Sequence, residues 1–217
     1  TEGQALAAFY GTSLSYWSRV NLYAAADYFD GVTGYLNMAS ADKLTTAVTV
    51  ANGGVLAGNG AINGAVTVAS GGVFGGVGSV SGLVTVQSGG ALAPGALASS
   101  GALSAAGTLT INGNLALNSG SSYNVQVGPT TSLAKVSGSA SVNGAKVNAN
   151  FALGDAVSQK YTILTASSVS GKFASVANTG LSGGLTDTLS YDGKTVALVM
   201  SIDPTAAGAV SDNQKAV

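Results

Sequence analysis

VTVANGG at residues 48–54 returns as VTVASGG at 66–72 and as VTVQSGG at 84–90, with a step of eighteen residues each time. Each repeat divides into three segments of six, and each six holds a short apolar run followed by small or turn-forming residues. The third position of each six is almost always large and apolar. These positions form three columns: Val50, Val68 and Val86; Leu56, Phe74 and Leu92; and Ile62 and Val80. A strict internal period of this kind is typical of a solenoid.

The six-residue segments predict short strands, because alternate side chains of a strand point to opposite faces. Three such strands with a bend after each make one triangular coil, and the next coil lies about 4.8 Å away in parallel pairing. In this stack the apolar columns face the interior, and the residues between them form an outward ladder of Thr49, Thr67 and Thr85. Gly, Asn and Ser suit the bends, since a sharp turn often needs a positive φ. The sequence therefore predicts an all-β fold, a right-handed parallel β-helix with three sides.

Competing folds agree less well with the repeat. An antiparallel sandwich has turns about every eight to twelve residues, and a membrane barrel has strands of about ten residues with sustained alternation. The Gly and β-branched content disfavours a helix. A membrane-spanning helix is excluded because Gly, Ser or Thr interrupts every apolar run before it reaches about eighteen residues.

Charge and composition exclude several classes of function. The net charge is −1, Lys and Arg total only 8, and no charged residue lies between Lys43 and Lys135. So few cations cannot neutralise a nucleic-acid backbone. The chain has no Cys and no His, which removes the usual nucleophilic triads and the zinc sites built from those ligands. The lack of Cys is compatible with an exported chain that stays unfolded during transit, and equally with a cytosolic one.

Beyond the regular repeats the pattern changes in steps. Residues 95–107, GALASSGALSAAG, form a longer excursion before the strands TLTINGN and LALNSGS. Longer strands and charged residues follow, and Tyr191-Asp192-Gly193-Lys194 predicts a hairpin turn with Asp-Gly at its centre. A hairpin suits the end of a solenoid, because an open last coil exposes an apolar edge. Ser211 or Asp212 is expected to cap a short helix at the end of the chain.

These changes divide the chain into four parts. They are an aromatic-rich segment (1–45), β-helix coils of eighteen-residue repeats (46–130), terminal coils with a cap (131–200) and a linker (201–217). Residues 1–44 hold eight of the fourteen aromatic residues, among them Tyr16, Trp17 and Tyr23. Three interpretations of this segment are open: a cap or remnant strands that cover the first coil, an aromatic platform for sugar or lipid, and the tail of an upstream domain.

Candidate catalytic groups are few, and we predict no catalytic, cofactor-binding or metal-binding residue. Glycoside hydrolysis needs paired carboxylates, or a base beside a cation. The repeats supply no carboxylate, and outside them the nearest pairs in sequence are Asp27 with Asp30 and Asp187 with Asp192. Asp30 and Asp192 each precede a Gly, which is typical of a turn.

Two glycine motifs resemble part of a nucleotide-binding loop. Gly58-x-Gly60 and Gly76-x-Gly78 would need a third Gly three residues on, but Asn63 and Ser81 stand there. The motif also returns after eighteen residues, as a structural bend does. We therefore expect bends at both places.

Several segments resemble the passenger repeats of Gram-negative autotransporters, the type V secretion proteins. The segment that resembles these repeats is NGGVLAGNGAINGAVTVASGGVFGGVGSVSGLVTVQSGGALAPG at 52–95. Three later segments are similar to the last passenger coils of that family: GTLTINGNLALNSGSSYNVQV at 107–127, YTILTASSVSGKFASV at 161–176 and LSYDGKTVALVM at 189–200. DNQKAV at 212–217 resembles the start of the linker that enters the outer-membrane barrel. It implies a pertactin-like passenger stalk on the cell surface or secreted, exported through its own C-terminal outer-membrane barrel, which lies beyond this chain. It also implies that roughly residues 108–200 act as an autochaperone that folds first.

Three functions follow as hypotheses. The first is a non-enzymatic stalk whose C-terminal part seeds folding, which is reasonable physically because parallel pairing closes long loops before it gains contacts. The second is an adhesin or self-associating module that contacts a host surface or neighbouring cells. The third and weakest is a β-helix enzyme that degrades polysaccharide. No nucleic acid, small-molecule substrate or cofactor is expected as a partner.

Overall fold

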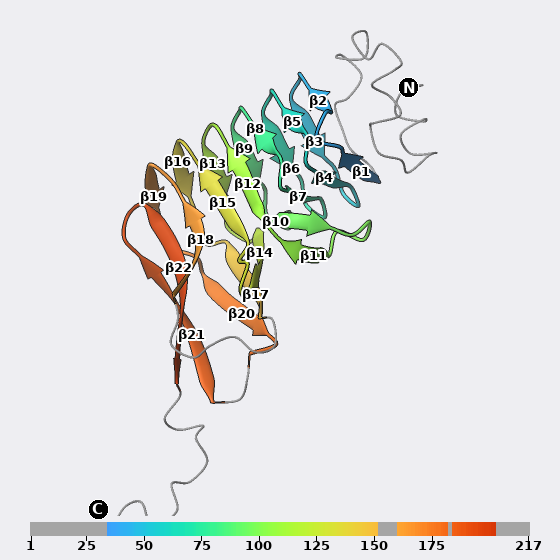
Figure 1. The fold of residues 1–217 in the computed structure, drawn as a ribbon. Helices are drawn as coiled ribbons and strands as arrows, with labels where there is room; N and C mark the ends of the chain where they lie inside the picture. The colour runs from blue at the N-terminus through green and yellow to red at the C-terminus, as the bar shows by residue number, and fades with distance from the viewer. Residues whose placement is uncertain (1–33, 152–159, 182–183, 203–217) are drawn as a thin grey trace, which may run out of the picture.

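The computed structural model describes residues 34–151, 160–181 and 184–202. Within these ranges the chain forms 22 β-strands and no helix, so the fold is all-β as the repeats predicted. The strands follow one another along an elongated stack, from β1 at one end to β21 and β22 at the other (Figure 1). They belong to three sheets.

Each sheet collects every third strand of the repeats. Sheet 1 contains Tyr35–Met38 (β1), Val55–Gly58 (β4), Val73–Gly76 (β7), Ala91–Leu97 (β10), Leu103–Ala106 (β11), Ser122–Val127 (β14), Lys146–Phe151 (β17) and Ser175–Thr179 (β20). Sheet 2 contains Lys43–Leu44 (β2), Ala61–Ile62 (β5), Ser79–Val80 (β8), Thr108–Ile111 (β12), Leu133–Val136 (β15), Lys160–Thr165 (β18), Leu185–Tyr191 (β21) and Thr195–Ile202 (β22). Sheet 3 contains Val48–Val50 (β3), Val66–Val68 (β6), Val84–Val86 (β9), Leu115–Leu117 (β13), Ser139–Ser141 (β16) and Ser168–Ser170 (β19).

The chain visits the three sheets in turn, and we call one pass through them a coil. Coils 1 to 3 are β1–β3, β4–β6 and β7–β9; coil 4 is β10, β12 and β13; coils 5 and 6 are β14–β16 and β17–β19. Consecutive coils pair in parallel. In sheet 3, Val50 pairs with Val68 and Val68 with Val86, so the predicted stacking of this column is confirmed.

The other predicted columns are confirmed as well. Leu56 pairs with Phe74 and Phe74 with Leu92 in sheet 1, while Ile62 pairs with Val80 in sheet 2. All these side chains are at most 3% exposed and belong to one hydrophobic cluster that draws on all three sheets. Thr49, Thr67 and Thr85 alternate with the buried valines and are partly exposed. Period two within each strand therefore puts the core between the sheets.

The bend from sheet 3 to sheet 1 has the same chemistry in every coil. Each bend carries Asn-Gly or Ser-Gly, and the six glycines have φ between +72° and +81°. Their backbones also stack: the Gly71 N–H donates to the Gly89 carbonyl at 2.9 Å, and Gly89 N–H to Gly120 at 3.0 Å. A Cβ on Gly89 would lie 2.4 Å from Ser70 Oγ. Glycine is required here by both the positive φ and the close approach.

The excursion after Pro94 is a β-hairpin, which the repeat pattern did not predict. The second half of strand β10 pairs antiparallel with β11, from Gly95 opposite Ala106 to Leu97 opposite Leu103. The turn is closed by the Gly101 N–H, which donates to the Ala98 carbonyl at 2.9 Å. Figure 1 shows this hairpin projecting from the side of the stack.

The C-terminal end of the stack is antiparallel. Strands β21 and β22 form the hairpin predicted around Asp192-Gly193, with Tyr191 opposite Val196. Strand β22 also pairs antiparallel with β18, the last strand that sheet 2 adds in parallel. The antiparallel hairpin β21–β22 thus covers the edge of sheet 2 to which a seventh parallel strand could otherwise add.

At the N-terminal end the stacking starts before the first eighteen-residue repeat. Strand β1 pairs with β4 and β2 with β5, so residues 35–44 already form sheet edges. The remaining aromatic residues of the N-terminal segment, and the helix expected after Ser211 or Asp212, lie outside the described residues.

Candidate functional site

The glycine motifs that resembled a nucleotide loop are bends where successive backbones touch. Gly76 has a φ of +120°, and a Cβ on it would lie 2.1 Å from the Gly58 carbonyl oxygen of the preceding coil. A Cβ on Gly78 would likewise lie 2.1 Å from the Gly60 carbonyl oxygen. The space that a phosphate would need is therefore occupied by the neighbouring coil.

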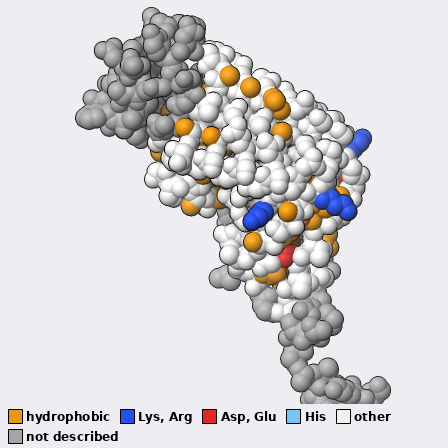
Figure 2. Space-filling view, turned by 180° about the vertical axis from the view of Figure 1, so that it is seen from behind, with side chains coloured by type: hydrophobic (Ala, Val, Ile, Leu, Met, Phe, Trp, Pro, Cys, Tyr) orange, Lys and Arg blue, Asp and Glu red, His pale blue; other side chains and the backbone are white. Residues whose placement is uncertain are grey.

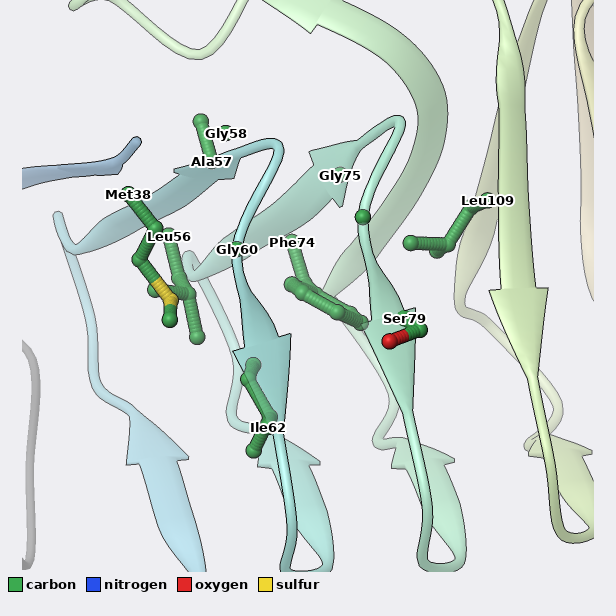
Figure 3. Close-up of a pocket in the computed structure, with 11 residues that line it drawn as sticks. Met38, Leu56, Ala57, Gly58, Gly60, Ile62, Phe74, Gly75, Ser79 and Leu109 are labelled. Atoms are coloured by element: carbon green, nitrogen blue, oxygen red, sulfur yellow. The ribbon is translucent and has the colours of Figure 1, made fainter. Parts of the chain in front are cut away.

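An interior cavity lies beside these bends, between coils 1 and 4. Its volume is about 10 Å³, and its walls include Met38, Leu56, Phe74 and Leu109. Figure 3 shows these side chains reaching into the interior from successive coils. The volume is at most that of one water molecule, and the lining is mainly apolar, so this cavity has no room for a substrate.

The aspartates of the described region serve turns and strands. Asp192 Oδ1 accepts hydrogen bonds from the backbone N–H groups of Lys194 and Thr195, and Oδ2 accepts one from Thr195 Oγ1 at 2.7 Å. These bonds, the Thr195 hydroxyl foremost, lower the pKa of Asp192 to about 2. Asp42 is 4% exposed, and its Oδ2 accepts the Ala39 N–H at 2.7 Å in the turn between β1 and β2.

Asp187 does not pair with Asp192. It lies on β21, where its Oδ1 accepts a hydrogen bond from Asn178 Nδ2 at 2.6 Å. Asp27, Asp30, Tyr16, Trp17 and Tyr23 lie outside the described residues. Within the ranges that the structure describes, no group of three or more acidic side chains comes together in a way that would hold a metal ion.

The best-built polar feature of the described region is Tyr123, which the sequence did not single out. Its side chain is 0% exposed, and it stands on β14 directly above Leu92. The hydroxyl donates to the Ile163 carbonyl of β18 and accepts the Ala134 N–H of β15 at 3.1 Å. Tyr123 therefore reaches from sheet 1 across the core to the two strands of sheet 2 where their parallel pairing begins.

Two further aromatic residues connect Tyr123 to the terminal hairpin. Its ring stacks on Phe173 with centroids 5.8 Å apart and planes 10° apart. The Phe173 N–H donates to the Tyr191 hydroxyl at 3.0 Å, at the end of β21. We call Tyr123, Phe173 and Tyr191 the aromatic bridge. It joins coil 5, the bend after coil 6 and the antiparallel end of the stack.

Electrostatics keep both hydroxyls of the bridge neutral. Burial raises the pKa of Tyr123 well above its ordinary value, and the Ala134 N–H opposes this only in part. Burial also raises the pKa of Tyr191, opposed by the hydrogen bond from Phe173. Neither tyrosine is therefore suited to act as a base near neutral pH, and the role that fits is holding strands together.

No protein-family model and no curated protein matches this chain. Among the described residues no helix is long and apolar enough to cross a membrane. In the face that Figure 2 shows, charged side chains gather toward the C-terminal strands and leave the N-terminal coils uncharged.

Proposed function

We propose that this chain is a non-enzymatic passenger stalk of an autotransporter, displayed at a Gram-negative cell surface, whose C-terminal part seeds folding. The observation that carries the proposal is the aromatic bridge, which joins the last parallel coils to an antiparallel hairpin. It rests as well on the resemblance of the segments at 52–95, 107–127, 161–176 and 189–200 to passenger coils, and of residues 212–217 to the linker that follows them. Its partner would be the outer-membrane domain through which the chain is exported.

The stalk would be a closed, right-handed β-helix. Every coil visits the three sheets in the same order, and one hydrophobic cluster runs through them. Parallel strands joined by short bends are compatible with a solenoid in which each coil contacts only its neighbours. The small cavity and the absence of paired carboxylates around it favour a structural role over catalysis.

The seed would be the part of the stack that can fold without the coils before it. The aromatic bridge and the β18–β22–β21 pairing supply contacts that an isolated eighteen-residue coil lacks. The hairpin β21–β22 joins two strands that are adjacent in sequence, so its formation costs little loop-closure entropy. Each earlier coil then adds to an edge that already exists.

Two matched substitutions test the folding order. Val196, in the terminal hairpin, and Val68, in coil 2, are both 0% exposed. Each Val→Ala change should destabilise by about 2 kcal/mol, enough for a reliable comparison of folding and unfolding rates. If the terminal part folds first, Val196→Ala slows folding and Val68→Ala mainly accelerates unfolding.

Chevron plots of the purified chain measure both effects. The opposite assignment, with Val68→Ala slowing folding and Val196→Ala leaving the folding rate unchanged, contradicts the seed. Location is tested separately with antibodies raised against residues 34–202 on cells that carry the natural gene. Labelling of intact cells supports surface display, and labelling only after permeabilisation contradicts it.

A second candidate, self-association, is favoured by the uncharged outer face of sheet 3 in coils 1 to 3. The outward ladder Thr49, Thr67 and Thr85 on this face carries no charge to repel another copy. Sedimentation velocity over a hundredfold concentration range tests this. A constant monomer removes self-association, while Thr67→Lys should abolish it where it occurs.

A further inference from the structure

The outer face of sheet 1 changes character along the stack. Its outward column runs Tyr35, Val55, Val73 and Ala91 in coils 1 to 4, and then Ser122, Lys146 and Ser175. A solvent-facing column of a sheet is usually polar. The apolar members therefore need a partner, and the polar ones do not.

The partner is the hairpin β10–β11. Leu97 and Ala93 of β10 form a hydrophobic cluster with Val55 and Ala57, against which Val73, Tyr35 and Leu103 pack. At the hairpin tip, a Cβ on Gly101 would lie 3.0 Å from Val73 Cγ2 and 3.3 Å from Val55 Cγ2. The hairpin thus lies directly on the outer face of coils 2 and 3.

The hairpin also reaches coil 1. Tyr35 Oη donates a hydrogen bond to the Leu97 carbonyl oxygen at 3.1 Å, across 62 residues of sequence. The base of β10 stays in sheet 1, where Ala91 and Leu92 pair with β14 of coil 5. One strand therefore begins on the C-terminal coils and ends against the first coil.

We propose that β10–β11 is a folding guide for coils 1 to 3. The proposal rests on the C-terminal-first order proposed above. In that order coil 4 forms before the three coils that its hairpin covers, so the hairpin projects beside the growing edge. Val73, Val55 and Tyr35 then dock against it one after another, while the inner columns stack on the edge itself.

Such a guide supplies information that the repeats lack. Coils 1 to 3 each carry the same Val-Thr-Val strand in sheet 3. Backbone pairing with the growing edge is therefore almost as favourable for a neighbouring coil as for the correct one. Tyr35 belongs to coil 1, the last coil to dock against the hairpin in this order. A stack that is one coil short leaves its hydroxyl about 4.8 Å from the position it needs, and the bond to Leu97 is lost.

Pulse-labelling hydrogen exchange during refolding of the whole chain tests the guide. Leu97→Ala truncates a buried side chain that packs the hairpin on Val55, while Ala96→Ser changes the neighbouring exposed residue and serves as the control. We expect Leu97→Ala to delay protection of β1–β9 about tenfold and to leave the protection rate of β12–β22 unchanged. Ala96→Ser should match the wild-type chain in both regions.

One outcome overturns the guide. If Leu97→Ala leaves the protection rate of β1–β9 unchanged and only accelerates its loss on unfolding, the hairpin docks after the coils and is a late clamp. Should Leu97→Ala not fold, Tyr35→Phe keeps the packing and removes one hydrogen bond. It is then expected to delay protection of β1 several-fold relative to the wild-type chain and to leave β7 unchanged, and an unchanged protection rate for β1 overturns the proposal.

The same data separate this inference from the proposed function. In the wild-type chain, protection of β1–β9 before β12–β22 contradicts the C-terminal seed. A correct wild-type order together with an unaffected Leu97→Ala contradicts the guide alone.

Discussion

At the scale of single residues, the stack depends on a few side chains that repeat nowhere else. Tyr123 is the main example, because it places a polar hydroxyl in a core cluster whose other buried members are Val, Leu, Ile, Ala, Met and Phe. Its two hydrogen bonds satisfy backbone groups of Ala134 and Ile163. A buried donor or acceptor without a partner costs more than a hydrogen bond gains.

Tyr123→Phe tests that argument. It keeps the stacking on Phe173 and removes the hydroxyl, so the free energy of unfolding should fall by about 1–3 kcal/mol. Denaturant unfolding monitored by circular dichroism measures the loss. Phe173→Leu is the companion variant, because it keeps both hydrogen bonds of Tyr123 and should lose only the aromatic contact, about 0.5–1.5 kcal/mol. Equal stability of Tyr123→Phe and the wild-type chain contradicts the role given to the hydroxyl.

A pair of glycines separates backbone strain from crowding. Gly76 and Gly193 both have positive φ, +120° and +85°, but a Cβ on Gly76 meets the Gly58 carbonyl, whereas nothing lies within 4 Å of one on Gly193. Gly193→Ala should therefore cost only the left-handed conformation, about 1–2 kcal/mol. Gly76→Ala must also push two coils apart and is expected to lower the melting temperature further. A lower melting temperature for Gly76→Ala than for Gly193→Ala indicates crowding in addition to backbone strain. Equal melting temperatures for the two variants indicate strain alone.

At the scale of elements, the terminal hairpin carries an acid-sensitive turn. Asp192 has a pKa of about 2 in the folded chain against an ordinary 3.8. The unfolded chain therefore takes up the proton first as the pH falls. The stability that this carboxylate contributes is present above about pH 4 and is lost between pH 4 and pH 2.

Asp192→Asn keeps an oxygen acceptor in the turn but does not titrate. Between pH 4 and pH 2 the melting temperature of the variant should fall less than that of the wild-type chain, because only the wild-type chain loses a charge at position 192. Identical pH dependence of the two proteins would show that the turn does not hold the Asp192 charge as the geometry indicates.

The elements also show what the sequence could and could not predict. Strands at eighteen-residue spacing were predictable, because identical apolar columns report the period directly. The step from Leu92 to its partner Tyr123 is 31 residues, longer than the repeat by the thirteen residues 95–107. That insertion hid the inward position of Tyr123, although SYNVQV alternates as a strand should. The hairpin itself is rich in Ala and Ser, and its partners Val55 and Val73 are distant in sequence, so no local signal predicted where it docks.

At the scale of the whole molecule, the stack is close to one-dimensional, because each coil pairs with the coil before it and the coil after it. The exceptions are the hairpin β10–β11, which spans coils 1 to 4, and the aromatic bridge at the C-terminal end. Stability in such a structure is approximately a sum of coil terms and interface terms. These two features therefore decide how far unfolding of one coil spreads to the others.

The period of the stack is tested by deletion. Removing residues 66–83, one complete coil of eighteen, joins Ala65 to Val84 and restores the same columns, since Val48 then stacks on Val84 as it did on Val66. We expect this chain to fold cooperatively, with a lower denaturant m-value because less surface becomes exposed on unfolding. Removing only residues 75–83 deletes β8 and joins sheet 1 directly to sheet 3. This deletion is half as long, yet it interrupts the core on one side and should lower the free energy of unfolding more. A larger loss of unfolding free energy from the eighteen-residue deletion would contradict a stack built from interchangeable coils.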